Sequence, residues 1–95
     1  MTELEKFMEW LKENDDCVNY NYVTNKGGVL RFEMFRENWE VWEKDSSLVL
    51  GQMGINLRSG SWKSIARYLV EYSRSPAYHL SGIWGAICDL KDYLQ

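Results

Sequence analysis

The sequence predicts one α+β domain: an N-terminal helix, a three- or four-stranded antiparallel β-meander, and two C-terminal helices packed on one face of the sheet. Three observations predict this order. Apolar residues recur at helical spacing near the start, polar and apolar residues alternate from Cys17 to Lys44, and helical spacing returns after Ser61. The chain has 95 residues, of which 45% are hydrophobic and 26% charged. These values are ordinary for a single folded domain, which we assign to residues 1–95.

The first helix is predicted over residues 3 to 14. Thr2 and Glu5 have the spacing of a capping box, in which each residue satisfies a backbone N–H of the other. The apolar residues that follow at helical spacing are Leu4, Phe7, Met8 and Leu11. Asn14, Asp15 and Asp16 favour ending the helix there, because carboxylates are unfavourable beside the negative end of the helix dipole.

The next segment has the period of two that is typical of strands. Residues Cys17–Thr24 alternate, Asn25–Gly28 interrupt the pattern, and Val29–Arg36 alternate again, which predicts a β-hairpin. Glu37-Asn38 is predicted as a two-residue turn into a third strand, Trp39–Lys44, because Asn tolerates the positive φ of tight turns.

The second half of the chain is predicted to be mainly helical. Leu48–Leu50 form a candidate fourth strand, and Gly51–Gly60, with three glycines, is predicted to be a connection. Ser61 is a suitable N-cap for a helix that ends near residue 73, with its apolar stripe at Trp62, Ile65, Ala66, Leu69 and Val70. Ser75-Pro76 predict the start of a second helix, because proline is favoured at the first helical position. Its stripe comprises Leu80, Ile83, Ile87, Leu90 and Leu94.

Charge and cysteine content exclude several classes of protein. The formal net charge of -3 disfavours a protein that binds duplex DNA mainly through phosphates, because such binding needs a surplus of Lys and Arg. No stretch approaches the roughly 18 to 20 apolar residues that span a bilayer, so we expect no membrane partner. Cys17 and Cys88 lack C-x-x-C spacing and are interpreted as reduced thiols, with a single bridge between them as the alternative. We therefore expect a cytoplasmic protein, located in the bacterial host cytoplasm if it is phage-encoded.

No residue pattern indicates catalysis, a cofactor or a metal. The single histidine, His79, lies nine residues before Cys88, which places the two on opposite sides of a continuous helix and disfavours a thiol-imidazole pair. No Cys/His spacing fits a metal site, and Asp15-Asp16 lacks the pattern of a calcium-binding loop. We expect a protein that is not an enzyme and that uses no cofactor.

The alternation of the strands also predicts what the outer sheet face carries. A turn at Glu37-Asn38 places Phe35 opposite Glu40 and Glu33 opposite Trp42. The other face then holds Leu30, Phe32, Met34, Trp39 and Val41, an apolar set suited to the core.

A four-residue loop in the first hairpin pairs Tyr22 with Arg31 and Tyr20 with Glu33, which puts the tyrosines on the outer face. An odd loop length or a bulge moves both tyrosines to the core face. With the four-residue loop, the predicted protein-binding residues are the anchors Tyr20, Tyr22, Phe35 and Trp42 and the polar rim Arg31 and Glu33. The alternative is that the aromatic residues, 15% of the chain, fill a small core.

A second candidate site is the start of the helix after Ser61. Hydroxyls at a helix N-terminus with flanking cations can hold an anion, and the residues in question are Arg58, Ser61, Lys63 and Arg67. The segment lacks the spacing of a phosphate-binding P-loop. The alternative interpretation is a capped helix start with Ser61 as N-cap.

These observations predict a small non-catalytic protein-binding domain, an inhibitor that occludes the working surface of another protein such as a bacterial defence or toxin nuclease or a nucleoprotein complex. The acidic residues of segment 1–16 would steer it toward a basic groove. Inhibitors from phages and bacterial immunity loci, anti-CRISPR proteins among them, are often of this size and charge, an argument from general type alone. The alternatives are a nucleic-acid or nucleotide binder that uses the basic helix 61–74, and a homodimeric accessory subunit.

Overall fold

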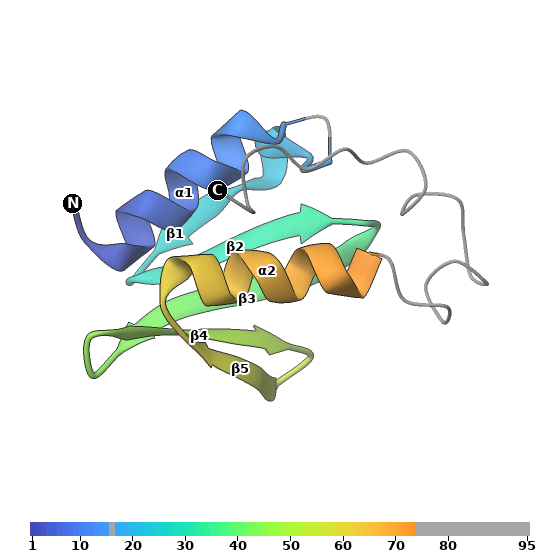
Figure 1. The fold of residues 1–95 in the computed structure, drawn as a ribbon. Helices are drawn as coiled ribbons and strands as arrows, with labels where there is room; N and C mark the ends of the chain where they lie inside the picture. The colour runs from blue at the N-terminus through green and yellow to red at the C-terminus, as the bar shows by residue number, and fades with distance from the viewer. Residues whose placement is uncertain (16, 74–95) are drawn as a thin grey trace.

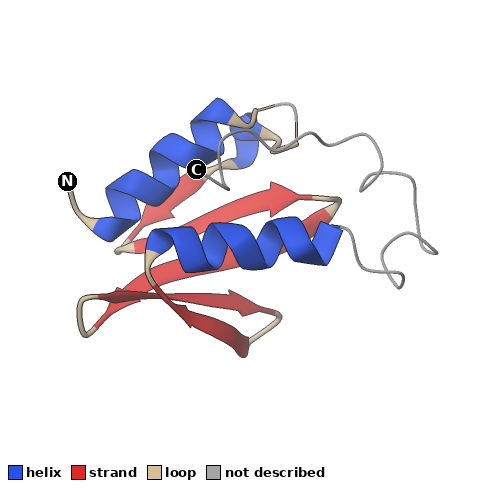
Figure 2. Cartoon of the chain, in the orientation of Figure 1, coloured by secondary structure: helices blue, strands red, loops and turns tan. Residues whose placement is uncertain are grey.

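The computed structural model describes residues 1–15 and 17–73, which form an antiparallel sheet with two helices on one face (Figures 1 and 2). The elements are α1 (Glu3–Glu13), a 3₁₀ turn η1 (Tyr20–Tyr22), β1 (Thr24–Lys26), β2 (Val29–Met34), β3 (Glu37–Lys44), β4 (Ser47–Gln52), β5 (Ile55–Gly60) and α2 (Trp62–Ser73). The strands lie in the order β1-β2-β3-β4-β5. The α+β class and the antiparallel sheet are confirmed.

The sheet has five strands, so the predicted three or four is wrong. The segment Gly51–Gly60, predicted to be a connection, instead contains the end of β4 and all of β5. The predicted first strand, Cys17–Thr24, is also wrong in most of its length: Tyr20–Tyr22 form η1, and only Thr24 lies in β1. Asn25 and Lys26, predicted to interrupt the hairpin, complete β1 and pair with β2. The predicted second C-terminal helix, with His79 and Cys88, lies outside the described residues.

Each hairpin closes with a two-residue turn in which both central residues have positive φ. The turns are Gly27-Gly28 (64°, 79°), Phe35-Arg36 (57°, 64°), Asp45-Ser46 (52°, 66°) and Met53-Gly54 (54°, 80°). These signs at both positions are those of type I′ turns, whose backbone twist matches the twist of the adjoining strands. Four such turns in series keep the meander tight and fix its register.

The second turn is at Phe35-Arg36, and the predicted turn at Glu37-Asn38 is wrong. Arg31 therefore pairs with Glu40, and Val29 with Trp42. Because the turn is displaced by an even number of residues, each side chain still faces the expected side of the sheet. Accordingly Leu30, Phe32, Met34, Trp39 and Val41 are all buried, as predicted for the core face.

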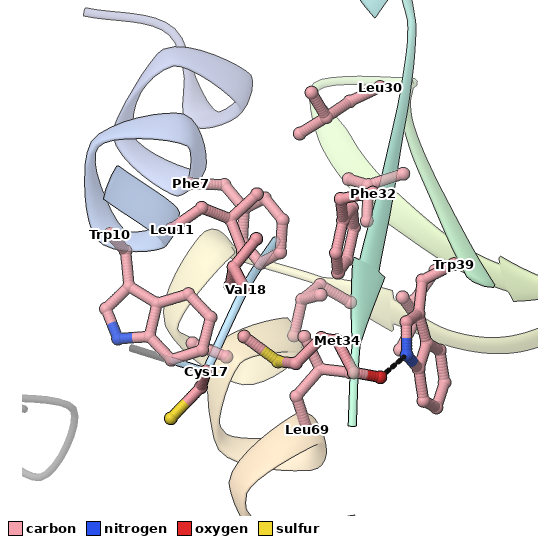
Figure 3. Close-up of a cluster of buried hydrophobic side chains, with 14 of the residues drawn as sticks. Phe7, Trp10, Leu11, Cys17, Val18, Leu30, Phe32, Met34, Trp39 and Leu69 are labelled. Atoms are coloured by element: carbon pink, nitrogen blue, oxygen red, sulfur yellow. Dashed lines mark hydrogen bonds between the residues drawn. The ribbon is translucent and has the colours of Figure 1, made fainter. Parts of the chain in front are cut away.

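The core lies between this face and the two helices. In Figure 3, Phe7 and Leu11 of α1 lie beside Phe32 of β2, with Leu69 of α2 close to Met34. The indole N–H of Trp39 donates to the Met34 carbonyl oxygen at 3.0 Å, which satisfies a buried polar group inside the apolar cluster.

Polar contacts fix the ends of the helices. The predicted capping box is confirmed: the Thr2 hydroxyl accepts from the Glu5 N–H at 3.1 Å, and the Glu5 carboxylate accepts from the Thr2 N–H at 2.9 Å. Near the end of α2, the Tyr72 hydroxyl donates to Glu37 at 2.8 Å, and the Gln52 amide donates to the other oxygen of that carboxylate at 3.0 Å. One carboxylate thus links α2 to β3 and β4.

Neither helix of the described ranges 1–15 and 17–73 is both long and apolar enough to cross a membrane.

Candidate protein-binding face

The face of the sheet opposite the helices is the candidate site, and we call it the open face. Alternation along the strands places on it Val29, Arg31 and Glu33 of β2, Asn38, Glu40, Trp42 and Lys44 of β3, and Ser47, Val49 and Gly51 of β4. In the described part of the chain both helices contribute their apolar side chains to the other face. The predicted location of the helices, on one face only, therefore holds for α1 and α2 (Figure 1).

Trp42 forms the apolar centre of the open face. It is half-buried, and its cross-strand neighbours are Val29 on β2 and Val49 on β4. Its indole lies over Gly51, where a Cβ atom would stand 3.1 Å from two carbons of the ring. Val49 is only 7% exposed although it faces away from the helices. The indole therefore packs against β4 and remains partly exposed.

An ion pair lies beside Trp42 on the same face. Arg31 Nε donates to Glu40 Oε2 at 2.9 Å, and the two residues are direct cross-strand partners. Glu33, the next outward residue of β2, is half-buried and stands opposite Asn38. Its carboxylate has no hydrogen-bond or ion-pair partner among residues 1–15 and 17–73.

A groove of about 300 Å³ runs along this ion pair. Its lining includes Tyr22, Arg31, Glu33, Asn38, Glu40 and Met53. Tyr22 is 64% exposed and Met53 is 92% exposed, so two large apolar side chains stand in solvent at the groove. Tyr22 is held there by η1, where its N–H donates to the Asn19 carbonyl oxygen at 3.0 Å. Met53 is held by the tight turn between β4 and β5.

The structure brings together four of the six predicted protein-binding residues. Tyr22, Arg31 and Glu33 line the groove, and Trp42 lies next to Arg31 and Glu40 on the open face. The expected pairing of Tyr22 with Arg31 is wrong, because Thr24 is the partner of Arg31 and the first turn has two residues instead of four. Tyr20 lies in η1 and not in a strand, so its expected pairing with Glu33 is also wrong.

Phe35 does not belong to the open face. It is 2% exposed and lies in the hydrophobic core at the β2–β3 turn, which corrects its predicted place among the outer aromatics. Burial of the ring offsets the cost of a positive φ at a residue with a Cβ. Sequence reasoning also missed Met53, because it assigned the Gly51–Gly60 segment to a connection.

The second candidate site lies around the start of α2. The Ser61 hydroxyl accepts from the Ser64 N–H at 3.3 Å, so the interpretation of Ser61 as a helix cap is confirmed. Arg58 Nε donates to the Ser64 hydroxyl at 3.3 Å, and Lys63 Nζ lies 5.8 Å from the centre of the Trp62 ring. Arg67 is exposed one turn after Lys63. These contacts stabilise the helix start, and the binding of an anion there stays a prediction.

Acidic side chains of the N-terminal segment are exposed. Glu9 and Glu13 of α1 and the following Asp15 face solvent. Within the described residues, no group of three or more His, Cys, Asp and Glu side chains is arranged to hold a metal ion.

A scan against protein-family models and searches of curated proteins and of solved structures find no match for this chain.

Proposed function

We propose that this chain is a small non-catalytic protein-binding domain whose open face docks on another protein and occludes that protein's working surface. The observation that carries the proposal is that the open face holds the half-buried Trp42 and that its groove along the Arg31–Glu40 ion pair is lined by the exposed side chains of Tyr22 and Met53. Aromatic residues, Met and Arg are enriched at the centres of protein interfaces, and exposed apolar side chains that cluster are typical of binding surfaces.

The rigidity of the open face supports the same proposal. Residues of three adjacent hydrogen-bonded strands form it, and the contact between Trp42 and Gly51 limits the movement of the indole. A surface that is already ordered loses little conformational entropy on binding, so more of the contact energy appears as affinity.

Charge favours a partner with a basic surface. The chain has a net charge of -3, and Glu9, Glu13 and Asp15 are exposed. Opposite charge raises the rate of association and excludes acidic partners. Basic grooves are characteristic of proteins that bind nucleic-acid phosphates. We therefore propose a nuclease or a nucleoprotein complex, such as those of bacterial defence or toxin systems, as the target.

The proposal is tested by capture from a nuclease-treated bacterial lysate with a tagged chain. The wild type is compared with Tyr22→Ala/Met53→Ala, the open-face variant, which alters the groove on the open face, and with Lys63→Ala/Arg67→Ala, which alters the basic helix. The changed side chains are exposed in both variants, so both should fold. Each captured protein is identified, purified and assayed for its own activity with the chain added.

The expected result is a protein retained by the wild type and by the basic-helix variant, lost with the open-face variant, and inhibited by the wild type. The proposal is contradicted if capture depends on Lys63 and Arg67 alone. Salt-sensitive retention of nucleic acid from untreated lysate would instead favour the nucleic-acid binder. Sedimentation as a dimer through the open face would favour the homodimer.

A further inference from the structure

We propose that the groove beside the Arg31–Glu40 ion pair receives a cationic side chain, an arginine above all, presented by the partner protein. This inference rests on the proposed function, because it assumes that a protein docks on the open face. It adds the chemistry by which the partner is recognised.

The charges in the groove do not cancel. Glu40 already binds Arg31 at 2.9 Å, which neutralises one carboxylate. Glu33 is half-buried in the same groove without an ion-pair partner among the residues that the structure describes. One negative charge is therefore left over at a partly desolvated position. A hydrogen bond between a carboxylate and a cationic donor is about twice as strong as a neutral one, so this position favours a cation.

The walls of the groove suit the rest of such a side chain. Tyr22 presents an aromatic ring, and Met53 presents a flexible thioether that adapts to what lies against it. A cation over the face of an aromatic ring is attracted by the ring's quadrupole. The aliphatic part of a long basic side chain can pack on Met53 while its charged end reaches Glu33.

Arginine fits this combination better than lysine. Its planar guanidinium can stack on the Tyr22 ring while two of its N–H groups donate to one carboxylate, and an ammonium group can do only one of these well. Asn38, the cross-strand partner of Glu33, adds an amide oxygen that can accept a further N–H.

Other occupants fit the groove less well. A purely apolar side chain would cover Glu33 without giving it a hydrogen bond, which costs free energy for a buried charge. An anionic group would meet the carboxylates of Glu33 and Glu40. A second copy of this chain is a different occupant, and sedimentation equilibrium distinguishes it from a partner protein.

The test is an NMR titration of the ¹⁵N-labelled full chain with a capped Gly-Gly-Arg-Gly-Gly peptide. The control peptide carries citrulline, which has the shape of arginine without its charge. The variant Glu33→Gln removes the unpartnered carboxylate, and Glu9→Gln removes an equal charge from the exposed side of α1 as a matched control.

We expect the arginine peptide to shift the amide signals around Tyr22, Glu33 and Met53, with the citrulline peptide at least about fivefold weaker. Glu33→Gln should weaken binding by about five- to tenfold, less than the loss of a whole charge-assisted hydrogen bond, because the Gln amide oxygen can still accept, and Glu9→Gln should weaken it less than twofold. Equal binding of both peptides, equal effects of the two variants, or shifts confined to α1 would overturn the inference.

Different results would contradict this inference and the proposed function. A captured protein that is lost with Tyr22→Ala/Met53→Ala but unaffected by Glu33→Gln overturns the cationic anchor and leaves the docking face in place. A captured protein indifferent to every open-face variant overturns the proposed function, whatever the peptide does. Sedimentation equilibrium could instead show a dimer that Glu33→Gln dissociates. That result would assign the groove to a second copy of the chain and contradict the proposal that it binds a side chain of a different protein.

Discussion

The indole of Trp42 lies across Gly51 of the neighbouring strand, and a Cβ atom at position 51 would stand 3.1 Å from two carbons of the ring. Packing on the open face therefore disfavours a side chain at this position of β4, whereas the backbone does not demand glycine there, because Gly51 is absent from the residues with positive φ. The pair thus packs β3 against β4 on the face that we propose binds a partner.

This relationship predicts a coupling between the two positions. Gly51→Ala should lower the free energy of unfolding by about 1–3 kcal/mol, the usual cost of forcing an extra methyl group into a packed site. In a Trp42→Ala background the same substitution should cost clearly less, because the ring is gone. Urea unfolding of the four proteins gives the coupling energy. An equal cost in both backgrounds would show that the ring is not what excludes the methyl group, and would point to the Ile55 carbonyl oxygen at 3.3 Å.

The third turn predicts a stabilising substitution. Ser46 has a φ of 66° and is exposed. Ser46→Gly gives Asp-Gly, a favoured type I′ pair, and removes the strain of a Cβ at positive φ. The free energy of unfolding should rise by about 0.5–1 kcal/mol after the entropic cost of glycine is subtracted. Ser59→Gly, within β5 and opposite Val49, is the control and should lower stability. Destabilisation by Ser46→Gly would mean that this turn does not form as described.

The capping box predicts a dependence on pH. Hydrogen bonds from the Thr2 backbone N–H, and then with the Thr2 side chain, hold the pKa of the Glu5 carboxyl below its ordinary value of 4.5. Because the folded pKa is the lower one, the stabilisation is fully present well above 4.5 and is lost as the pH falls through the folded pKa. Glu5→Gln should therefore be less stable than the wild type at neutral pH, and the difference should shrink in acid.

Thermal unfolding of both proteins from neutral to strongly acidic pH measures this difference. Glu9→Gln, on the same helix but outside the capping box, is the control. A gap between wild type and Glu5→Gln that stays constant with pH would show that the carboxylate makes no charge-dependent contact in the fold.

The link between α2 and the sheet predicts a fourth effect on stability. Tyr72→Phe keeps the edge-to-face contact with Trp39, whose ring centre is 5.1 Å away, but loses the hydroxyl that donates to Glu37 at 2.8 Å. Loss of a hydrogen bond to a charged group should cost about 1.5–3 kcal/mol. Tyr68→Phe is the control, because no hydrogen bond of the Tyr68 hydroxyl is seen in the described residues. Equal midpoints of denaturant unfolding for the two variants would contradict a role for Glu37 as the link.

The sequence predicted which face of the sheet each side chain occupies better than it predicted the positions of the turns. Alternation assigned Leu30 and Trp39 to the core correctly even though the turn was misplaced, because a displacement by two residues preserves the face. The turn itself was missed because Phe and Arg, the residues at positions 35 and 36, rarely adopt a positive φ, whereas Asn, the residue at position 38, tolerates one. Burial of the Phe35 ring, which depends on the tertiary structure, offsets the cost of the positive φ at that position.

The candidate site was predicted in part for a similar reason. Trp42 and Arg31 followed from the alternation of strands that were recognised. Met53 did not, because the glycines around it indicated a connection, although Gly51 serves packing and Gly54 serves a tight turn. Tyr22 was expected on the correct side but in a strand. The groove joins η1 to the β4–β5 turn, two segments far apart in the sequence, and no local pattern predicts such a contact.

The most direct test of the open face is the affinity of a purified captured partner for three proteins, measured by calorimetry at one salt concentration. They are the wild type, Tyr22→Ala/Met53→Ala and Lys63→Ala/Arg67→Ala, each with the wild-type unfolding midpoint. We predict at least about a 30-fold loss for the first variant, the scale of an interface hot spot, and less than about a threefold loss for the second. The reverse order would place binding on α2 and contradict the assignment of the open face.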